Sequence, residues 1–337
     1  MSLDRRAQRI VIAGASSLPG NEMKTVLEES RFAGWDLRLV DEELVAGTLT
    51  EAGGEAALIQ RVEEDTFHGA RYAFLTGSVE FAKSCMAPAQ EAGATIIDLS
   101  QASLENPDAT PWFPKIVALT GKSVAKSAKV FSVFSAGGTA LASLALALRR
   151  AGLRRLVGVM LQPVSEAGRE GIEELETQTS QLLSFQSVGQ QVFGTQAAFN
   201  LLPRFATACR QDLHRRLLRI RAEVSAAIGD ADEDAKIGLT LVHAPVFYGL
   251  TFSACADLDE RTEQAVLGEI CRQAGFTLVE AGEAAPSNVS VAGEGGVFLR
   301  RPEGDTAREG SWWFWGAADN LRLPAISAMT LAEWLEG

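Results

Sequence analysis

The stretch RIVIAGASSLPGNEMKTVL, residues 9–27, decides the fold of the N-terminal part of this chain. Its first five residues form a short β-branched apolar run, which is typical of a fully buried parallel strand. The glycine turn GASSLPG follows, and after it apolar residues recur at helical spacing. A strand, a glycine turn and a helix in this order predict the start of a βαβ unit.

The alternation of strands and helices continues along the first half of the chain. It predicts strands over residues 37–40, 71–75 and 95–97 and a helix over residues 79–92. Residues 130–148 carry no charge over nearly the length of a bilayer span, but we expect Gly137 and Gly138 to break a helix in their first half. A buried strand, a turn and a buried helix explain them better. The first half therefore predicts an α/β fold, a doubly wound parallel sheet of the dinucleotide-binding type.

After about Leu148 the pattern changes to β-rich segments separated by long helices, which predicts a second domain of the α+β type. Strands are expected over residues 156–161, 238–242, 246–252 and 312–316, and helices over residues 169–185, 211–227 and 325–335. The helix over 211–227 has a local basic face, for which a solvated or interface role is favoured over anion binding. This face comprises Arg215, Arg216, Arg219 and Arg221.

Composition and charge narrow the classes of function. The 337 residues carry a formal net charge of −12, and a field of this sign repels phosphate backbones and anionic lipid. We therefore expect neither nucleic acid nor membrane partners. The N-terminus lacks the apolar region of a signal peptide. Scattered cysteines without a zinc-binding pattern fit a cytoplasmic protein with no metal site, and they are Cys85, Cys209, Cys255 and Cys271.

The glycine turn is the first candidate binding site. Gly14 and Gly20 stand six residues apart between a strand and a helix, where backbone N–H groups and the helix dipole can hold a pyrophosphate. The middle position is Ser17 rather than glycine, so a Cβ could crowd the phosphates while the hydroxyl groups donate to them. A plain turn is an equally good explanation. The candidate cofactor-binding residues here are Gly14, Ser16, Ser17, Leu18, Gly20 and, after the strand over 71–75, Gly77.

Asp41 bears on the type of cofactor. It lies 21 residues after Gly20 at the end of the second predicted strand, where an acidic side chain can accept a hydrogen bond from a ribose 2′-hydroxyl. Glu42 and Glu43 add negative charge that repels a 2′-phosphate. If a dinucleotide binds, NAD is favoured over NADP; a solvated acidic turn with no cofactor is the alternative.

Six segments, in order along nearly the whole chain, resemble the aspartate-semialdehyde dehydrogenase family. They are IAGASSLPGNEM, SVEFAKSCMAPAQEAGATIIDLS, QPVSEAGREGIEEL, AAFNLLPR, APVFYG and ADNLR, beginning at Ile12, Ser78, Gln162, Ala197, Ala244 and Ala318. The resemblance implies a Rossmann-type domain completed by the C-terminal helix, residues 1–148 plus 317–337. It also implies an α+β substrate and dimerisation domain, residues 149–316, and a homodimer.

The residues that carry the family's chemistry are replaced in this chain. The family's nucleophilic cysteine falls at Ala136 or at Thr139, depending on the direction of counting, and its histidine acid/base falls at Leu250. The arginine for the substrate carboxylate falls at His243, which lacks the bidentate fork of a guanidinium. A hydroxyl is a far weaker nucleophile than a thiolate unless a base activates it. No catalytic residue of the family reaction is therefore expected here.

Several binding positions of the family are retained. By resemblance Gln162 matches the glutamine that orients the acyl intermediate, and Asn320 matches the asparagine that contacts the nicotinamide. Gly168 and Gly171 keep the glycine-rich substrate loop, in which Glu166 replaces a small residue. A purely structural role explains each of these residues equally well.

Three hypotheses follow from the sequence. The first is a catalytically inactive, cytoplasmic, homodimeric relative of aspartate-semialdehyde dehydrogenase that binds at most a nucleotide or small metabolite. The second is an NAD-dependent oxidoreductase acting on a semialdehyde or another carbonyl substrate without a covalent intermediate, with Thr139, Ser135 or His243 as its polar groups. The third is a dimeric interaction or assembly protein. It draws on the tryptophans near residue 313, of which Trp313 and Trp315 should share one face of a strand.

Overall fold

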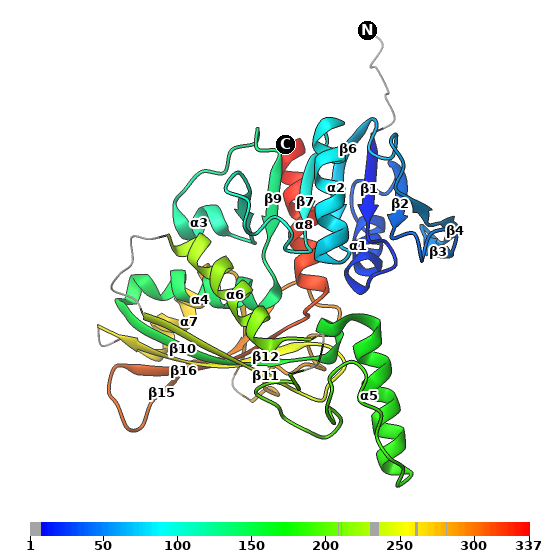
Figure 1. The fold of residues 1–337 in the computed structure, drawn as a ribbon. Helices are drawn as coiled ribbons and strands as arrows, with labels where there is room; N and C mark the ends of the chain where they lie inside the picture. The colour runs from blue at the N-terminus through cyan, green and yellow to red at the C-terminus, as the bar shows by residue number, and fades with distance from the viewer. Residues whose placement is uncertain (1–7, 208, 210, 230–235, 260–261, 281) are drawn as a thin grey trace. The chain divides into compact units, whose positions relative to one another are not determined.

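A computed structural model describes residues 8–207, 209, 211–229, 236–259, 262–280 and 282–337 (Figure 1). The first seven residues, on which part of the N-terminal prediction rests, lie outside this description. The chain divides into two compact units. The first comprises Met1–Pro114, Ser123–Phe134 and Pro324–Gly337, and the second comprises Lys115–Lys122 and Ser135–Leu323.

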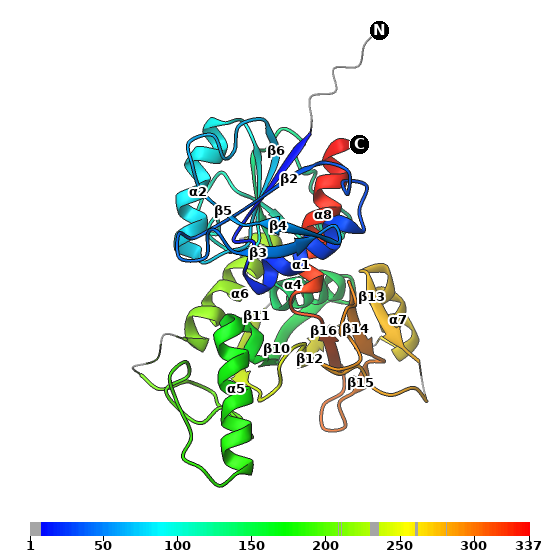
Figure 2. The same cartoon turned by 90° about the vertical axis from the view of Figure 1, so that its right-hand side faces the viewer.

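The first unit is built on a seven-stranded sheet in which every neighbouring pair is parallel, in the order β5-β2-β1-β6-β7-β9-β8. Helix α2 (Val79–Glu91) lies on one face of the sheet, while α1 (Leu18–Glu28) and α8 (Arg322–Glu336) lie on the other (Figure 2). The doubly wound prediction is confirmed. The strands are β1 (Arg9–Ala13), β2 (Asp36–Asp41), β5 (Gln60–Arg61), β6 (Ala70–Leu75), β7 (Thr95–Asp98), β8 (Thr110–Trp112) and β9 (Val130–Val133), and a separate hairpin pairs β3 (Leu49–Ala52) with β4 (Glu55–Leu58).

The C-terminal helix is held in the first unit by hydrogen bonds across more than 200 residues of sequence. The Tyr72 hydroxyl donates to Glu336 Oε1 at 2.7 Å, and Trp112 Nε1 donates to the Ser327 carbonyl at 2.9 Å. Both aromatic residues are buried, and the bond of Trp112 is itself buried, whereas that of Tyr72 reaches the exposed Glu336. The end of the chain thus completes the unit that its beginning starts.

The second unit contains a mixed sheet in the order β11-β10-β12-β16-β14-β13, with β15 paired to β16. Helices α4, α6 and α7 cover one face of it (Figure 1). The strands are β10 (Leu153–Gln162), β11 (Lys236–His243), β12 (Leu250–Leu258), β13 (Phe276–Val279), β14 (Val297–Arg300), β15 (Glu303–Gly304) and β16 (Ser311–Ala318). The helices are α3 (Ile116–Thr120), α4 (Ala136–Leu148), α5 (Gly168–Leu183), α6 (Leu213–Ile228) and α7 (Gln264–Gln273), with short 3₁₀ turns η1 (Arg149–Ala151) and η2 (Val164–Ala167).

The division between the units differs from the boundary expected at Leu148. Helix α4 groups with the second unit, so the chain crosses between units at Phe134 and Ser135. The physical reason is that α4 packs against α6 and against strands β10 and β12, all of which belong to the second unit. Residues 317–323 also group with the second unit, because β16 runs to Ala318 in its sheet.

Two predictions about local structure need correction. Residues 130–148 do form a strand, a turn and a buried helix, but Gly137 and Gly138 lie inside the first turn of α4 and do not break it. The strand expected over 246–252 begins only at Leu250, because Pro245 lacks an N–H group and Gly249 adopts φ +84°. Residues 246 and 247 instead accept hydrogen bonds from the turn η2, at Val164 and Ser165.

The other face of the second sheet carries partly exposed apolar side chains. Register places Val157, Cys255 and Trp313 in one row across the sheet and Val159, Ser253 and Trp315 in the next. Trp313 is 45% exposed while Phe314 is 1% exposed, which confirms the expected alternation of faces along β16. Within the described ranges, no helix combines the length and apolar character needed to cross a bilayer.

Candidate functional site

The glycine turn of the first unit is tightly constrained. Gly14 has φ +92°, and a Cβ there would lie 2.1 Å from the Gly77 nitrogen; a Cβ on Gly20 would lie 2.2 Å from the Gly14 carbonyl oxygen. These glycines therefore let β1, α1 and the end of β6 approach closely. The Ser17 hydroxyl donates to the Gly14 and Thr76 carbonyls and accepts from the Gly20 N–H, while Leu18 begins α1.

Asp41 is engaged within the chain. Its Oδ2 accepts the Ser16 N–H at 2.7 Å and its Oδ1 accepts the Glu42 N–H at 2.8 Å, and the side chain is 6% exposed. The carboxylate thus braces the glycine turn, a role that the sequence did not reveal. Each oxygen retains a second lone pair for another donor.

A cavity of about 580 Å³ opens beside Asp41 at the carboxyl ends of β2 and β5. Carboxylates dominate its lining, and its one lining arginine, Arg61, is paired with Glu63 at 2.9 Å. Such a lining disfavours a phosphate group. The lining residues are Asp41, Glu42, Glu43, Arg61, Val62, Glu63, Glu64 and Phe81.

In the second unit, the turn at which the resemblance predicts the nucleophile begins α4. Ser135 is the N-cap of this helix, and its hydroxyl accepts the Gly138 N–H at 3.1 Å. Ala136 is the first helical residue and offers no functional group. The Thr139 hydroxyl is buried and meets no hydrogen-bond partner among the residues that the structure describes. Neither residue has a base positioned by a hydrogen bond to it.

A buried glutamate from α6 covers this turn. Glu223 is 1% exposed; its Oε1 accepts the Ser135 N–H at 2.8 Å and its Oε2 accepts the Ser135 hydroxyl at 2.6 Å. A negative charge is favoured at a helix N-terminus. A Cβ on residue 138 would lie 1.9 Å from Glu223 Oε2, so Gly138 makes room for the carboxylate. An acidic residue on the apolar stripe of a helix is the signal that could have revealed this contact; the stripe is Ile220, Val224 and Ala227.

Leu250 and His243, the positions at which the resemblance puts the base and the substrate arginine, are both buried. Leu250 is a buried first residue of β12. His243 is 1% exposed and lies between Phe193 and Phe205, each ring centroid 5.5 Å from its own, with Nε2 3.2 Å from the Ala197 carbonyl. Burial lowers the pKa of His243; the Ala197 hydrogen bond opposes this and Arg216 adds to it. The imidazole is therefore neutral at pH 7.

Gln162 and Asn320 end up in different settings. Gln162 is the buried last residue of β10, and its carbonyl accepts the Ala244 N–H. The Asn320 amide donates to Ser165 Oγ and to Glu166 Oε1, both at 3.1 Å, and its Oδ1 accepts the Gly249 N–H at 3.0 Å. Asn320 therefore ties together two loops of the second unit.

The substrate-type loop keeps its glycines for geometric reasons. Gly168 has φ +75°, and a Cβ on Gly171 would lie 2.5 Å from the Val164 carbonyl oxygen. Arg216, on the basic face for which a solvated or interface role is predicted, is 18% exposed at its side chain and contacts Glu166. The first turn of α6 packs near η2 there, so this arginine does not face water.

No cysteine is prepared for nucleophilic chemistry. Burial raises the pKa of Cys85 to about 11 and that of Cys271 to about 12. Burial likewise raises the pKa values of Cys209 and Cys255, with nearby acidic groups adding to the rise. A reactive cysteine requires the opposite shift. Among the described residues, no group of three or more His, Cys, Asp or Glu side chains is arranged to hold a metal ion.

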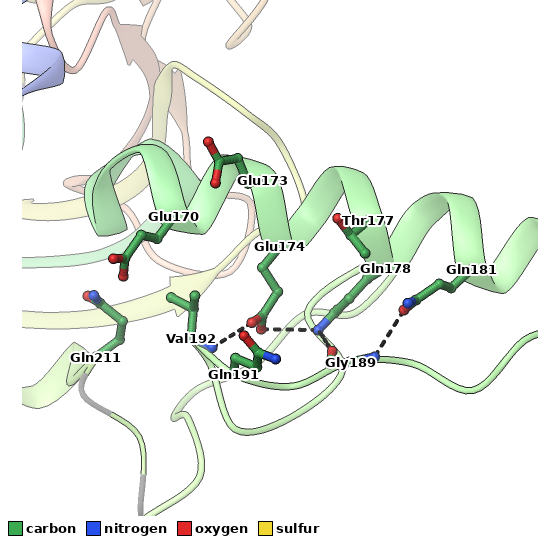
Figure 3. A pocket seen from close by; sticks show the side chains of 10 residues that line it. All are labelled: Glu170, Glu173, Glu174, Thr177, Gln178, Gln181, Gly189, Gln191, Val192 and Gln211. Carbon is green, nitrogen blue, oxygen red and sulfur yellow. Dashed lines mark hydrogen bonds between the residues drawn. The ribbon is translucent and has the colours of Figure 1, made fainter. Parts of the chain in front are cut away.

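A second cavity, of about 630 Å³, lies along α5 in the second unit (Figure 3). Glu174 and Gln178 hold the facing segment: Glu174 Oε2 accepts the Val192 N–H at 2.5 Å, and Gln178 donates to the Gly189 carbonyl at 2.7 Å. Figure 3 shows Gln211 beside Glu170 at one end. The cavity walls are polar and acidic.

Comparisons with known proteins cover nearly the whole chain. Residues 144–323 match the family "Semialdehyde dehydrogenase, dimerisation domain". A USG-1 protein homolog of Azotobacter vinelandii is 31% identical, and an aspartate-semialdehyde dehydrogenase of Rickettsia bellii is 26% identical, each over 97% of both chains.

Solved structures of aspartate-semialdehyde dehydrogenases share the fold of this chain. A probable aspartate-semialdehyde dehydrogenase from Pseudomonas aeruginosa superposes with a TM-score of 0.87 at 26% identity, covering 98% of this chain and 99% of its own. An aspartate semialdehyde dehydrogenase from Candida albicans, solved with NADP, shares the fold at a TM-score of 0.68 and 12% identity, over 98% of each chain. The family match over residues 144–323 and the relatives that align over 97% of the chain show that the chain belongs to the semialdehyde dehydrogenase family, as a homologue of aspartate-semialdehyde dehydrogenases and of USG-1 proteins.

Proposed function

We propose that this protein is a cytoplasmic, homodimeric member of the family that does not catalyse the family reaction. The observation that carries the proposal is the turn before α4. Neither of the two positions at which the resemblance puts the nucleophile, Ala136 and Thr139, carries a thiol, and the Glu223 carboxylate occupies the Ser135 N–H and hydroxyl. Leu250 at the position of the base and a neutral His243 at that of the substrate arginine give further support.

The proposal has an energetic basis. Loss of a nucleophile or a general base commonly lowers turnover by several orders of magnitude, and about 10⁶-fold for whole triads. A buried carboxylate at the N-terminus of α4 also repels the oxyanion that acyl transfer would develop there. None of the three polar groups considered for a different oxidoreductase reaction is arranged as an acid/base. Ser135 and His243 are already hydrogen-bonded, and the Thr139 hydroxyl has no base beside it.

For the cofactor, we propose that Gly14, Ser16, Ser17, Leu18, Gly20 and Gly77 form a dinucleotide site with a preference for NAD over NADP. The acidic cavity beside Asp41 supports this preference, since a 2′-phosphate there would face several carboxylates. Asn320 and Gln162, with Gly168, remain candidate contacts for a small ligand. The homodimer is supported by the match to a dimerisation domain and by the partly exposed row that contains Trp313.

The decisive experiment is a turnover assay of the purified protein with aspartate semialdehyde, inorganic phosphate and either NAD or NADP. We expect a rate below a thousandth of the ordinary value of about 10 s⁻¹. A catalytically competent relative assayed beside it supplies the positive control. Turnover above that limit contradicts the proposal. Calorimetric titration with NAD and NADP tests the cofactor preference separately, and tighter binding of NADP overturns it.

A further inference from the structure

Glu166 is held by two donors from distant parts of the second unit. Its Oε1 accepts from the Asn320 amide at 3.1 Å, and its Oε2 lies 3.4 Å from Arg216 Nη1. Arg216 comes from α6 and Asn320 from the segment before α8, so a guanidinium and a carboxamide converge on one carboxylate. This is the donor set with which proteins bind the carboxylate of a small molecule.

Arg216 is a poorly solvated cation. Its side chain is 18% exposed, and its other donor, Nη2, is used by the Glu166 carbonyl at 2.5 Å and by Gln211 Oε1 at 2.7 Å. Burial lowers the pKa of Arg216, while the charge of Glu166 opposes that shift. A guanidinium in this setting stays charged and requires an anion beside it.

The Glu166 side chain is more exposed than the Arg216 side chain that it contacts. The Glu166 side chain is 33% exposed and extends from the short 3₁₀ turn η2. The longer of its two carboxylate contacts is the one to Arg216. A carboxylate that arrives from solution can therefore compete for the same donors once this side chain is shortened.

Room for the remainder of such a ligand lies next to Arg216. Gln211, which accepts from the guanidinium, lines the cavity of about 630 Å³ along α5 (Figure 3). Cavities of 300–1,000 Å³ are the usual size of small-molecule sites. Glu170 and Glu173 make this cavity acidic, which favours a neutral or cationic remainder.

We propose that Arg216 and Asn320 form a binding site for the carboxylate of a small ligand with a neutral or cationic remainder, and that Glu166 occupies this site as a tethered carboxylate. The inference extends the proposed function. It concerns binding alone, and its test contains neither cofactor nor phosphate. Its failure is therefore distinguishable from the appearance of turnover in the assay above.

The test is calorimetric titration of the full-length protein with 4-aminobutyrate. We expect Glu166→Ala to bind it at least about tenfold more tightly than the wild type, which is the contribution of a charge-assisted hydrogen bond. Glu176→Ala is the matched control, since it removes one negative charge from an exposed side chain of α5. It should bind as the wild type does. n-Butylamine, which lacks the carboxylate, should gain nothing.

A second pair of variants assigns the gain to the proposed donors. Glu166→Ala combined with Arg216→Gln should lose the gain, and circular dichroism verifies that the double variant is folded. Glu166→Gln keeps the shape of the side chain and should show a smaller gain, together with a melting temperature that rises when 4-aminobutyrate is added. Equal affinity of the wild type and Glu166→Ala overturns the proposal. A gain that survives Arg216→Gln also overturns it.

Discussion

Replacement of Gly138 by alanine should destabilise the second unit, although helix propensity alone favours the opposite sign. In a helix, glycine to alanine contributes up to about 1 kcal/mol of stability. Here the new Cβ would lie 1.9 Å from Glu223 Oε2 and 2.8 Å from its Cδ. The carboxylate must move, and it loses its bonds to the Ser135 N–H at 2.8 Å and to the Ser135 hydroxyl at 2.6 Å.

The lost bonds outweigh the gain in propensity. Each hydrogen bond to a charged group contributes about 1.5–3 kcal/mol, and the displaced carboxylate remains in a buried setting. We expect Gly138→Ala to lower the free energy of unfolding by about 2–4 kcal/mol. At a urea m-value of about 2–3 kcal/mol/M, the midpoint falls by roughly 1 M.

The assay is urea denaturation together with hydrogen exchange of residues 136–148, which reports on α4 itself. Gly137→Ala is the matched control. Its Cβ would meet only side-chain atoms of Ile220 at 3.0 Å and Met160 at 3.2 Å, which can shift, so the change should stay within about 1 kcal/mol.

A double-mutant cycle makes the prediction specific. In a Glu223→Ala background the carboxylate is absent and only the Cβ of residue 223, 3.1 Å from the new Cβ, stays close, so Gly138→Ala should be nearly neutral, which gives a coupling energy of about 2 kcal/mol or more. A stabilising effect of Gly138→Ala in the wild type would refute the reasoning. An equal effect in both backgrounds would refute it as well.

Three further predictions concern titration, reactivity and assembly. The pKa of His243 is lowered by folding, so the unfolded chain binds a proton more readily than the folded chain. The free energy of unfolding should therefore fall as the pH drops below about 6.5. His243→Gln should reduce the difference in stability between pH 5 and pH 7, as measured by urea denaturation. Cys85 and Cys271, with pKa values of about 11 and about 12, should resist iodoacetamide at pH 8 in the folded protein and react in urea, as read by mass spectrometry; rapid native labelling of either contradicts their burial. Sedimentation at micromolar concentration should give a dimer, and Trp313→Glu should shift it toward monomer, whereas a monomeric wild type removes the dimer proposal.

Local pattern predicted most elements of the first unit, but it missed the strands β5 and β8 and the β3–β4 hairpin. The apolar run before the glycine turn is β1 from Arg9 to Ala13, and the helix expected over 79–92 is α2. These elements are specified by short-range features, namely period, caps and glycine turns. The same holds for Gly14 and Gly20, whose spacing reflects close backbone approach within a few residues.

The contacts that decide the chemistry of the second unit could not be predicted in this way. Glu223 meets Ser135 across 88 residues of sequence, and Glu166 meets Arg216 across 50. Side-chain contacts at such separations leave no period in the sequence. The glycine pair misled the prediction because its helix-weakening effect is real, but the packing of α6 outweighs it.

The side chains around the first turn of α4 and around η2 pack as groups rather than one at a time. The small residue at 138 and the carboxylate of Glu223 fit only together, and the carboxylate of Glu166 meets the guanidinium of Arg216 and the amide of Asn320. His243 is neutral and enclosed by two aromatic rings, so it requires no anion. Under the proposed function, a chain that lacked only the nucleophile would keep donors for a substrate without acceptors. Glu166 and Glu223 instead supply acceptors from the chain itself, which is why a gain of binding on removal of Glu166 tests the proposed site more directly than a further loss of activity.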